Sequence, residues 1–215
     1  MSGASAGTAA GHDRPQPRLF LVRHGQTDWS ASGQHTGWTD LPLNDTGRRQ
    51  AALLAARLAP MRFAAVFTSP LVRALDTCRA AGLAEEATVD PDLREWDYGE
   101  YEGRTTDEIR ETQPRWSIWA DAVPGGETID DVAARVDRVI ERTLRVEGDV
   151  AIFGHGHCLR ILAARWLRLE PEIGGLLELS TATISRLGWE RERRVLELWN
   201  DAAHLDTSEA TAGGR

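Results

Sequence analysis

The stretch Leu19-Phe20-Leu21-Val22-Arg23-His24-Gly25 decides the fold class of this 215-residue chain. Its first four residues are all apolar, without the alternation expected of a strand that has one face in water, so they predict a strand buried on both faces. Such strands are typical of parallel sheets that are covered by helices. The run then ends in a cation, an imidazole and a glycine, where the carboxyl end of a parallel strand would place groups that bind a ligand.

Two more predicted strands end in polar residues in the same way. Residues 64–68 form an apolar run before Ser69 and Pro70, which we expect to start a helix with Ser69 as its N-cap, and residues 149–153 precede Gly154-His155-Gly156. The other predicted elements are helices at 44–59, 105–112, 128–147 and 159–169 and strands at 182–188 and 195–199. This alternation predicts an α/β fold with three α/β/α layers, in which helices cover both faces of a mostly parallel central sheet.

Composition and length predict one domain over residues 18–206, with a disordered leader at 1–17 and a disordered tail at 207–215. The chain is long enough to bury a substantial core without metals or disulfides. Its two cysteines, Cys78 and Cys158, are far apart and lack CxxC spacing, which excludes a disulfide framework or a zinc ribbon and favours a reducing cytoplasm.

The charged residues exclude several function classes. The chain has no lysine, so it lacks the group that a P-loop or a Schiff-base enzyme requires. The net charge of −8 is concentrated between Glu85 and Glu111, where eleven acidic residues accompany three arginines. A nucleic-acid partner is therefore not expected, because binding of that kind requires a basic face. The longest aliphatic run, residues 51–56, is too short to cross a membrane, so no membrane partner is expected either.

The three strand ends can meet in one crevice beyond the carboxyl edge of the sheet. They would bring together Arg23, His24, Arg73 and His155, and the helix that starts at Pro70 would add backbone N–H groups. Two arginines, two imidazoles and a helix N-terminus form a site suited to a phosphate dianion. Each residue alone also has a structural interpretation, since a single histidine is often a core or capping residue and a single arginine often lies on a solvated helix face.

Other candidate groups are weaker. His155, His157 and Cys158 lack a convincing fourth metal ligand, so no metal site is predicted. His35 and His204 are expected at the surface, and the tryptophans are expected mainly in the core.

Several motifs resemble those of the histidine phosphatase superfamily, the group similar to phosphoglycerate mutases, and the first of them resembles its RHG signature. The similar segments are LVRHGQT (21–27), HTGWTDLPL (35–43), TSPLVRA (68–74), LREWDYG (93–99), PGGET (124–128) and GHG (154–156). They follow the order of the family, and the resemblance extends from about Arg18 to Asn200.

The resemblance implies that His24 is the nucleophile that accepts a phosphoryl group and that Glu95 protonates the leaving oxygen. It implies that Arg23, Arg73 and His155 hold the phosphoryl oxygens, with no cofactor or metal. The residues expected to contact the substrate are Thr27, Ser30, Thr36, Gly37, Tyr98, Gly156 and His157. Burial beside Asp97 and Glu100 would keep Glu95 protonated, so we expect an acidic to neutral pH optimum.

The chain departs from the mutase pattern. Ser30 replaces the usual asparagine, Thr106 replaces a substrate-binding lysine, and the segment between Gly103 and Pro124 is too short for the mutases' long insertion. The sequence is more similar to sedoheptulose-bisphosphatase-like and broad-specificity acid phosphatase members. This similarity implies a phosphatase that acts on small phosphate esters, such as sugar phosphates or bisphosphates, and releases inorganic phosphate. A phosphoglycerate mutase and a non-catalytic phosphate-binding module remain as alternatives, and a homodimer is left open.

Overall fold

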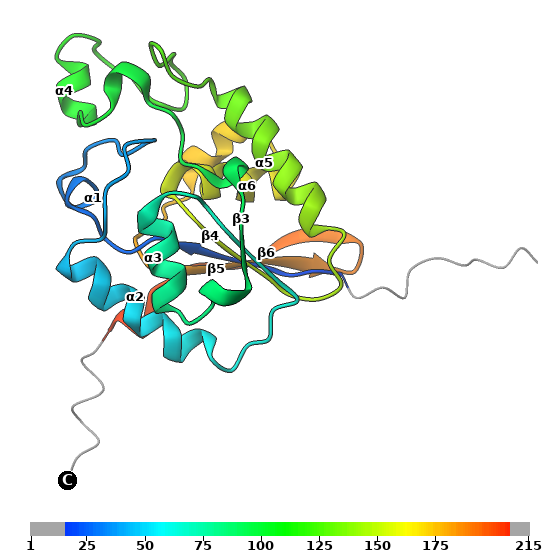
Figure 1. Cartoon of the computed structure of the whole chain (residues 1–215). Helices are drawn as coiled ribbons and strands as arrows, with labels where there is room; N and C mark the ends of the chain where they lie inside the picture. Colours follow the sequence, from blue (N-terminus) through cyan, green and yellow to red (C-terminus); the bar gives the residue numbers. More distant parts are fainter. Residues whose placement is uncertain (1–15, 207–215) are drawn as a thin grey trace, which may run out of the picture.

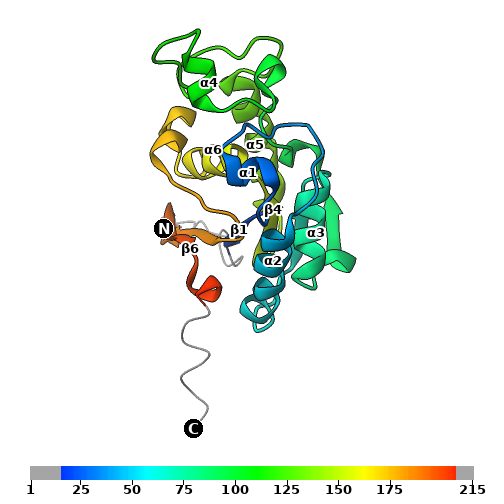
Figure 2. The ribbon, with the colours of Figure 1, turned by 90° about the vertical axis from the view of Figure 1, so that its left-hand side faces the viewer.

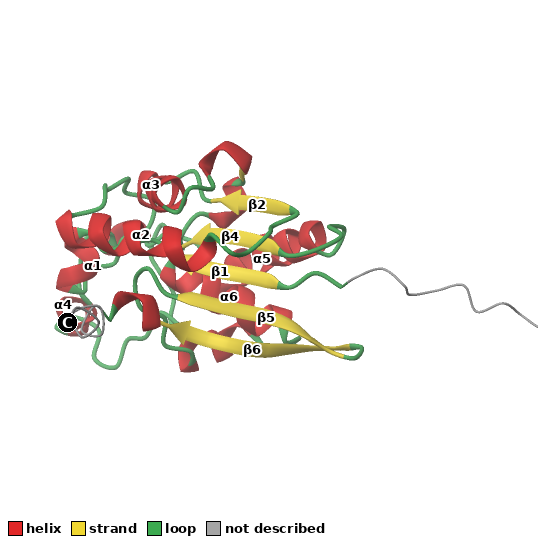
Figure 3. Ribbon diagram, turned by 90° about the horizontal axis from the view of Figure 1, so that it is seen from below, coloured by secondary structure: helices red, strands yellow, loops and turns green. Residues whose placement is uncertain are grey.

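The computed structural model describes residues 16–206 and contains one mixed sheet of six strands in the order β3-β2-β4-β1-β5-β6 (Figure 3). The strands are β1 (Leu19–Arg23), β2 (Ala65–Thr68), β3 (Ala87–Val89), β4 (Val150–Gly154), β5 (Ile184–Glu190) and β6 (Arg193–Asp201). Strands β3, β2, β4 and β1 pair in parallel, whereas β5 is antiparallel to β1 and to β6. The mostly parallel sheet confirms the predicted fold class.

Helices cover both faces of this sheet (Figures 1 and 2). The α-helices are α1 (Asp28–Ser32), α2 (Asp45–Leu58), α3 (Val72–Ala80), α4 (Thr106–Arg110), α5 (Ile129–Thr143) and α6 (Gly156–Trp166). Short 3₁₀ turns are η1 (Ala84–Glu86), η2 (Pro91–Leu93), η3 (Gly99–Tyr101), η4 (Pro171–Leu176) and η5 (Ala203–Leu205). Strand β1 shows the layering: Leu19 and Leu21 pack in one core cluster with α5 and α6, and Phe20 and Val22 pack in the other with α2 and α3.

Two helices begin elsewhere than predicted. Helix α6 begins at Gly156, earlier than residue 159, because the Glu95 carboxylate accepts hydrogen bonds from the N–H groups of His157 and Cys158. Helix α3 begins at Val72 with Leu71 at the N-cap, so the prediction that Ser69 is the N-cap was wrong. The Oδ1 atom of Asp40 accepts a hydrogen bond from the Val72 N–H at 2.7 Å. In both cases a carboxylate remote in sequence binds the free N–H groups of the helix, a contact that local patterns do not reveal.

Further differences are small. Helix α5 ends at Thr143 rather than at residue 147, and β3 and α1 were not predicted. Helices α1 and α4 stand beside each other beyond the sheet (Figure 1), joined by a bridge between Gln34 and Thr105. No helix within residues 16–206 is long and apolar enough to cross a membrane.

The predicted leader, apart from residues 16 and 17, and the predicted tail lie outside the described residues. Pro17 is buried, and its carbonyl accepts a hydrogen bond from the Trp189 indole N–H at 3.0 Å.

Candidate active site

A cavity of about 170 Å³ lies beyond the carboxyl ends of β1 and β4. Segments far apart in the sequence meet there: the end of β1, the region of α1, the loop before η3 and the N-terminal part of α6. Its lining residues are Arg23, His24, Ser30, Gly33, Gln34, His35, Thr36, Glu95, Tyr98, Gly156, His157, Arg160 and Leu179. The cavity therefore forms beyond the carboxyl ends of the strands, where the sequence predicted a crevice.

His24 has the geometry of a nucleophile. Burial, together with the charges of Arg73 and Arg23, holds the pKa of His24 well below the ordinary value for histidine. The ring is therefore neutral near pH 7, and its Nδ1 lies 2.7 Å from the carbonyl oxygen of Gly25. Because a carbonyl only accepts, Nδ1 carries the proton, and Nε2 keeps an available lone pair.

Arg23 supplies a cation to the same cavity. Its Nη1 donates to the carbonyl of Leu179, whereas its Nε is buried without a hydrogen-bond partner in the described structure. A Cβ at Gly156 would lie 3.4 Å from Cζ of Arg23 and 3.6 Å from Oε2 of Glu95, so the glycine leaves open the space between these two groups. A buried N–H without a partner is costly, and an anion in the cavity would satisfy it.

Arg73 and His155 form a second layer around His24. The Arg73 guanidinium donates to the carbonyls of Thr36, Gly37 and Thr39 at 3.1, 2.7 and 3.0 Å, and its Nε donates to Nδ1 of His155 at 3.1 Å. The neutral His155 ring therefore carries its proton on Nε2, which donates to Ser69 Oγ at 2.7 Å.

The rings of His24 and His155 lie 5.2 Å apart between centroids. Burial, with the charge of Arg73, holds the pKa of His155 well below its ordinary value. The structure thus brings together the two arginines and two histidines expected from the strand ends, with Arg73 and His155 behind the residues that line the cavity.

Glu95 is buried, with 4% of its surface exposed, as expected. Its carboxylate accepts hydrogen bonds from the backbone N–H groups of Trp96, His157 and Cys158 at 3.0, 3.0 and 2.8 Å. The positive end of α6 thus replaces the acidic surroundings that we expected, and Asp97 instead accepts from the N–H of Gly99.

Aromatic rings and imidazoles form the far wall of the cavity. The His35 ring lies 4.8 Å from the Tyr98 ring, and the Tyr98 hydroxyl lies 2.6 Å from Nδ1 of His157. Burial raises the pKa of Tyr98 well above its ordinary value, so this hydroxyl keeps its proton and donates it. Burial also lowers the pKa of His35 to about 4 and that of His157 well below its ordinary value, so this wall is uncharged near pH 7.

Two expectations about side chains need correction or refinement. His35 was expected at the surface but is only 9% exposed, because it packs between Tyr98 and Trp116. Trp96 is a core residue as expected, whereas Trp119 lies beside the His157 ring at 5.1 Å and under the Arg160 guanidinium at 4.5 Å.

Five of the seven residues expected to contact the substrate line the cavity, namely Ser30, Thr36, Tyr98, Gly156 and His157. Thr27 and Gly37 do not. Thr27 caps α1 through its side chain, and Gly37 offers its carbonyl to Arg73. A Cβ at Gly37 would lie 2.5 Å from the carbonyl oxygen of Trp96, so this position supports the site from behind.

Sequence reasoning did not identify Gly33, Gln34, Arg160 and Leu179, which also line the cavity. Arg160 could have been found, because it follows Gly156 by four residues and so lies on the same side of a helix.

The structure offers no metal cluster within residues 16–206, where no three His, Cys, Asp or Glu side chains come together suitably. Both ring nitrogens of His155 are bonded to protein groups, and burial raises the pKa of Cys158 to about 12.

Comparison with known proteins gives consistent matches. The family model of the histidine phosphatase superfamily, branch 1, matches residues 19–202. An acid phosphatase of Mycobacterium tuberculosis is 40% identical over 191 residues, which cover 87% of this chain and 94% of that protein. A sedoheptulose 1,7-bisphosphatase of Saccharomyces cerevisiae is 40% identical over 185 residues, covering 71% of this chain and 68% of that protein.

Two further matches complete the comparison. A probable phosphoglycerate mutase of Photorhabdus laumondii is 31% identical over 205 residues, covering 88% of this chain and 95% of that protein. A solved structure of a Mycobacterium tuberculosis open reading frame superposes with a TM-score of 0.81 at 39% identity, covering 86% of this chain and 97% of that chain.

Proposed function

Because the chain belongs to the histidine phosphatase superfamily, branch 1, we propose that it hydrolyses small phosphate monoesters through a phosphohistidine on His24. One observation carries the proposal: His24, Arg23 and Glu95 line one cavity. His24 is neutral with its Nε2 available, and Arg23 has a buried Nε–H without a partner in the described part of the chain. A nucleophile, an anion-binding cation and a proton carrier are the groups that phosphoryl transfer needs.

In the first step the Nε2 lone pair of His24 forms a bond to phosphorus, and the ester P–O bond breaks. The leaving oxygen receives a proton from the Glu95 carboxyl group. The phosphorylated ring becomes cationic, and its Nδ1–H donates to the Gly25 carbonyl. Arg23, with Arg73 and His155 behind it, stabilises charge on the phosphoryl oxygens.

In the second step water attacks phosphorus while the Glu95 carboxylate accepts a proton from it. The P–N bond breaks, its electron pair returns to Nε2, and inorganic phosphate leaves. The backbone N–H groups that donate to Glu95 suit the ionised carboxylate that this step requires.

The cavity favours a polyhydroxylated substrate such as a sugar phosphate. Ser30, Gln34 and Thr36 offer polar groups, and the neutral imidazoles of His35 and His157 can exchange hydrogen bonds with hydroxyl groups. Arg160 adds a second cation to the lining, which suits a bisphosphate. The relatives named acid phosphatase and sedoheptulose 1,7-bisphosphatase support this substrate class.

Phosphoglycerate mutase activity is the second candidate, because a protein named as a probable mutase matches over most of the chain. Thr106, at the position where the resemblance places a mutase lysine, lies 3.3 Å from His35 Nε2 through its hydroxyl. Thr106 supplies no cation where the resemblance places the mutase lysine, so hydrolysis is favoured. Incubation of 3-phosphoglycerate with a bisphosphate primer would reveal mutase activity as 2-phosphoglycerate.

The central test is phosphate release from p-nitrophenyl phosphate and from sugar phosphates in the presence of EDTA. Wild type should turn over, and His24→Ala should not. His204→Ala is the matched control, because His204 does not line the cavity and should be dispensable. If the phosphoryl group of the substrate is labelled, acid quenching during turnover should release the label from the protein. Alkaline quenching should retain it as a P–N adduct on His24. A label on another residue, or phosphate binding without turnover, would contradict the proposal.

We also propose a cytoplasmic location, because Cys78 and Cys158 are both free thiols in the structure.

A further inference from the structure

A largely buried ion pair outside the cavity lies next to the segment that carries Glu95. Arg135, on α5, is 6% exposed, and its Nε and Nη2 donate to the two carboxylate oxygens of Glu127 at 2.9 and 3.0 Å. Removing such a pair from water is expensive, and apolar residues of similar size often stabilise a core equally well. We therefore expect the pair to have a role other than stabilising α5.

The remaining N–H donors of Arg135 bind the main chain of the segment that carries Glu95. Its Nη1 donates to the backbone carbonyls of Asp92 and Arg94 at 2.8 and 2.6 Å, and its Nη2 donates to the carbonyl of Glu95 at 3.1 Å. One rigid guanidinium thus binds the main chain at and just before Glu95.

Glu127 holds the same segment from the other side. Its Oε2 accepts from the backbone N–H of Asp97 at 3.0 Å, and its carbonyl accepts from the indole N–H of Trp96 at 2.8 Å. Together the two residues bind the chain before, at and after Glu95.

This support matters because Glu95 lies on an irregular stretch between η2 and η3, without a helix or strand of its own. A proton donor must come within hydrogen-bond reach of the oxygen that it protonates, at roughly 2.6–3.2 Å. The N–H groups of α6 bind the carboxylate itself, and contacts to the irregular backbone fix the point from which the Glu95 side chain extends.

We propose that Arg135 and Glu127 are positioning residues that hold the Glu95 carboxyl group at the leaving oxygen. The inference rests on the proposed phosphatase function and deepens it. Neither residue lines the cavity, so both act through Glu95 and do not touch the substrate.

The dependence of the rate on the leaving group tests this role. An alkoxide, as from glycerol phosphate, needs a proton from Glu95, whereas p-nitrophenolate leaves readily without one. The measured quantity is kcat/KM for glycerol phosphate divided by kcat/KM for p-nitrophenyl phosphate, on one preparation of each full-length variant. The ratio is independent of the folded fraction, so partial misfolding of a variant does not obscure the result.

The variants are Arg135→Lys, which can still pair with Glu127 but cannot bind three carbonyls, and Glu127→Gln, which keeps the shape and removes the charge. We expect the ratio to fall about 10-fold to 100-fold in both, because a displacement of about 1 Å is enough to cost that much. Glu95→Gln should lower it further, by about 10² to 10⁴.

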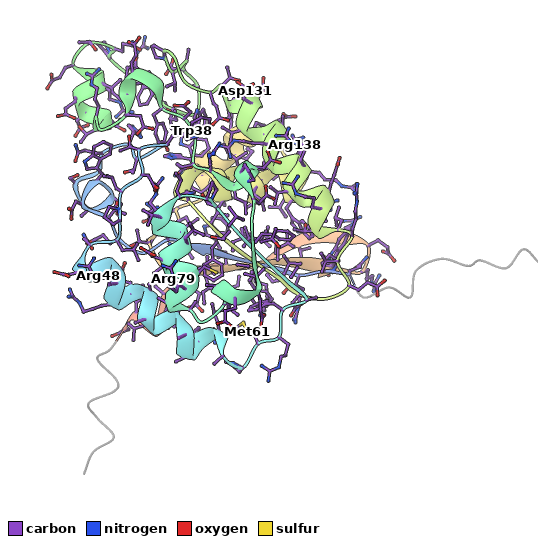
Figure 4. All side chains as sticks on the ribbon, in the orientation of Figure 1. Trp38, Arg48, Met61, Arg79, Asp131 and Arg138 are labelled. Atoms are coloured by element: carbon purple, nitrogen blue, oxygen red, sulfur yellow. The ribbon has the colours of Figure 1, made fainter. Side chains whose placement is uncertain are left out.

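Arg138→Gln is the matched control. Arg138 lies on the same helix, but its side chain is 55% exposed at the outer surface (Figure 4). It binds the carboxylate of Asp92 and the carbonyl of Ala134 on its own helix, and not the backbone of the Glu95 segment. Its ratio should equal that of wild type.

Ratios within about twofold of wild type for both Arg135→Lys and Glu127→Gln, with kcat/KM lowered equally on the two substrates, would overturn the inference and leave the pair a purely structural role. An unchanged ratio in Glu95→Gln would overturn it by removing Glu95 as the acid. Phosphatase activity that still requires His24 would then show that the proposed function survives.

Discussion

Replacing Gly47 with alanine should weaken the protein, although alanine is the better helix former. Gly47 lies in the first turn of α2, where its Cα packs directly on the backbone that follows His24. A Cβ there would lie 2.0 Å from the carbonyl oxygen and 2.7 Å from the nitrogen of Gln26. Gly25 has the reciprocal contact, with a Cβ 2.5 Å from the Gly47 oxygen, so neither side has a flexible group that could yield.

The expected size of the effect follows from these distances. Real Cβ contacts are essentially never shorter than 3.0 Å, so α2 or the 25–26 backbone must move by about 1 Å. Alanine would gain about 1 kcal/mol in helix propensity, whereas overpacking costs about 1–3 kcal/mol. The free energy of unfolding should therefore fall by up to about 2 kcal/mol. Because Gly25 accepts the hydrogen bond that orients His24, kcat/KM should fall about 100-fold.

The assay combines urea denaturation with kcat/KM for p-nitrophenyl phosphate. Arg49→Ala, at an exposed position in the same turn, is the control and should change the free energy of unfolding by less than about 0.5 kcal/mol without altering activity. If Gly47→Ala proved more stable than wild type by about 1 kcal/mol, with kcat/KM within about twofold, the steric reasoning would be refuted.

Three other predictions follow from the site. Three histidines of the cavity, His24, His35 and His157, and His155 behind it have lowered pKa values in the folded state, so the unfolded chain binds more protons as the pH falls below about 6.5. Urea titrations should show that the free energy of unfolding falls with the pH, with His35 alone costing about 3 kcal/mol by pH 4. A flat profile from pH 7 to 4 would contradict this. Over the same range kcat/KM should persist below pH 6.5, because His24 remains neutral. Arg73→Lys should lower kcat/KM about 100-fold or more, because an ammonium cannot bind the carbonyls of the 36–39 loop and His155 together. Activity near that of wild type would show that the planar guanidinium of Arg73 is dispensable.

The cavity and its surroundings also contain features that local patterns could not predict. Burial of His35 depends on Tyr98 and Trp116, which are more than sixty residues away in the chain, so a polar local sequence misled the expectation of a surface role. Arg135 reads as an ordinary residue of an amphipathic helix, and only the packing of α5 on the Glu95 segment shows which carbonyls it binds.

The sequence by itself determined the layered α/β fold and the strand ends that carry Arg23, His24 and His155, because apolar runs and the polar residues that end them are local properties of the chain. Only the tertiary structure decided where α3 and α6 begin, which ring nitrogen of His24 keeps its lone pair, and what surrounds Glu95. Those features depend on hydrogen bonds between groups distant in sequence, and such partners are settled only when the layers pack.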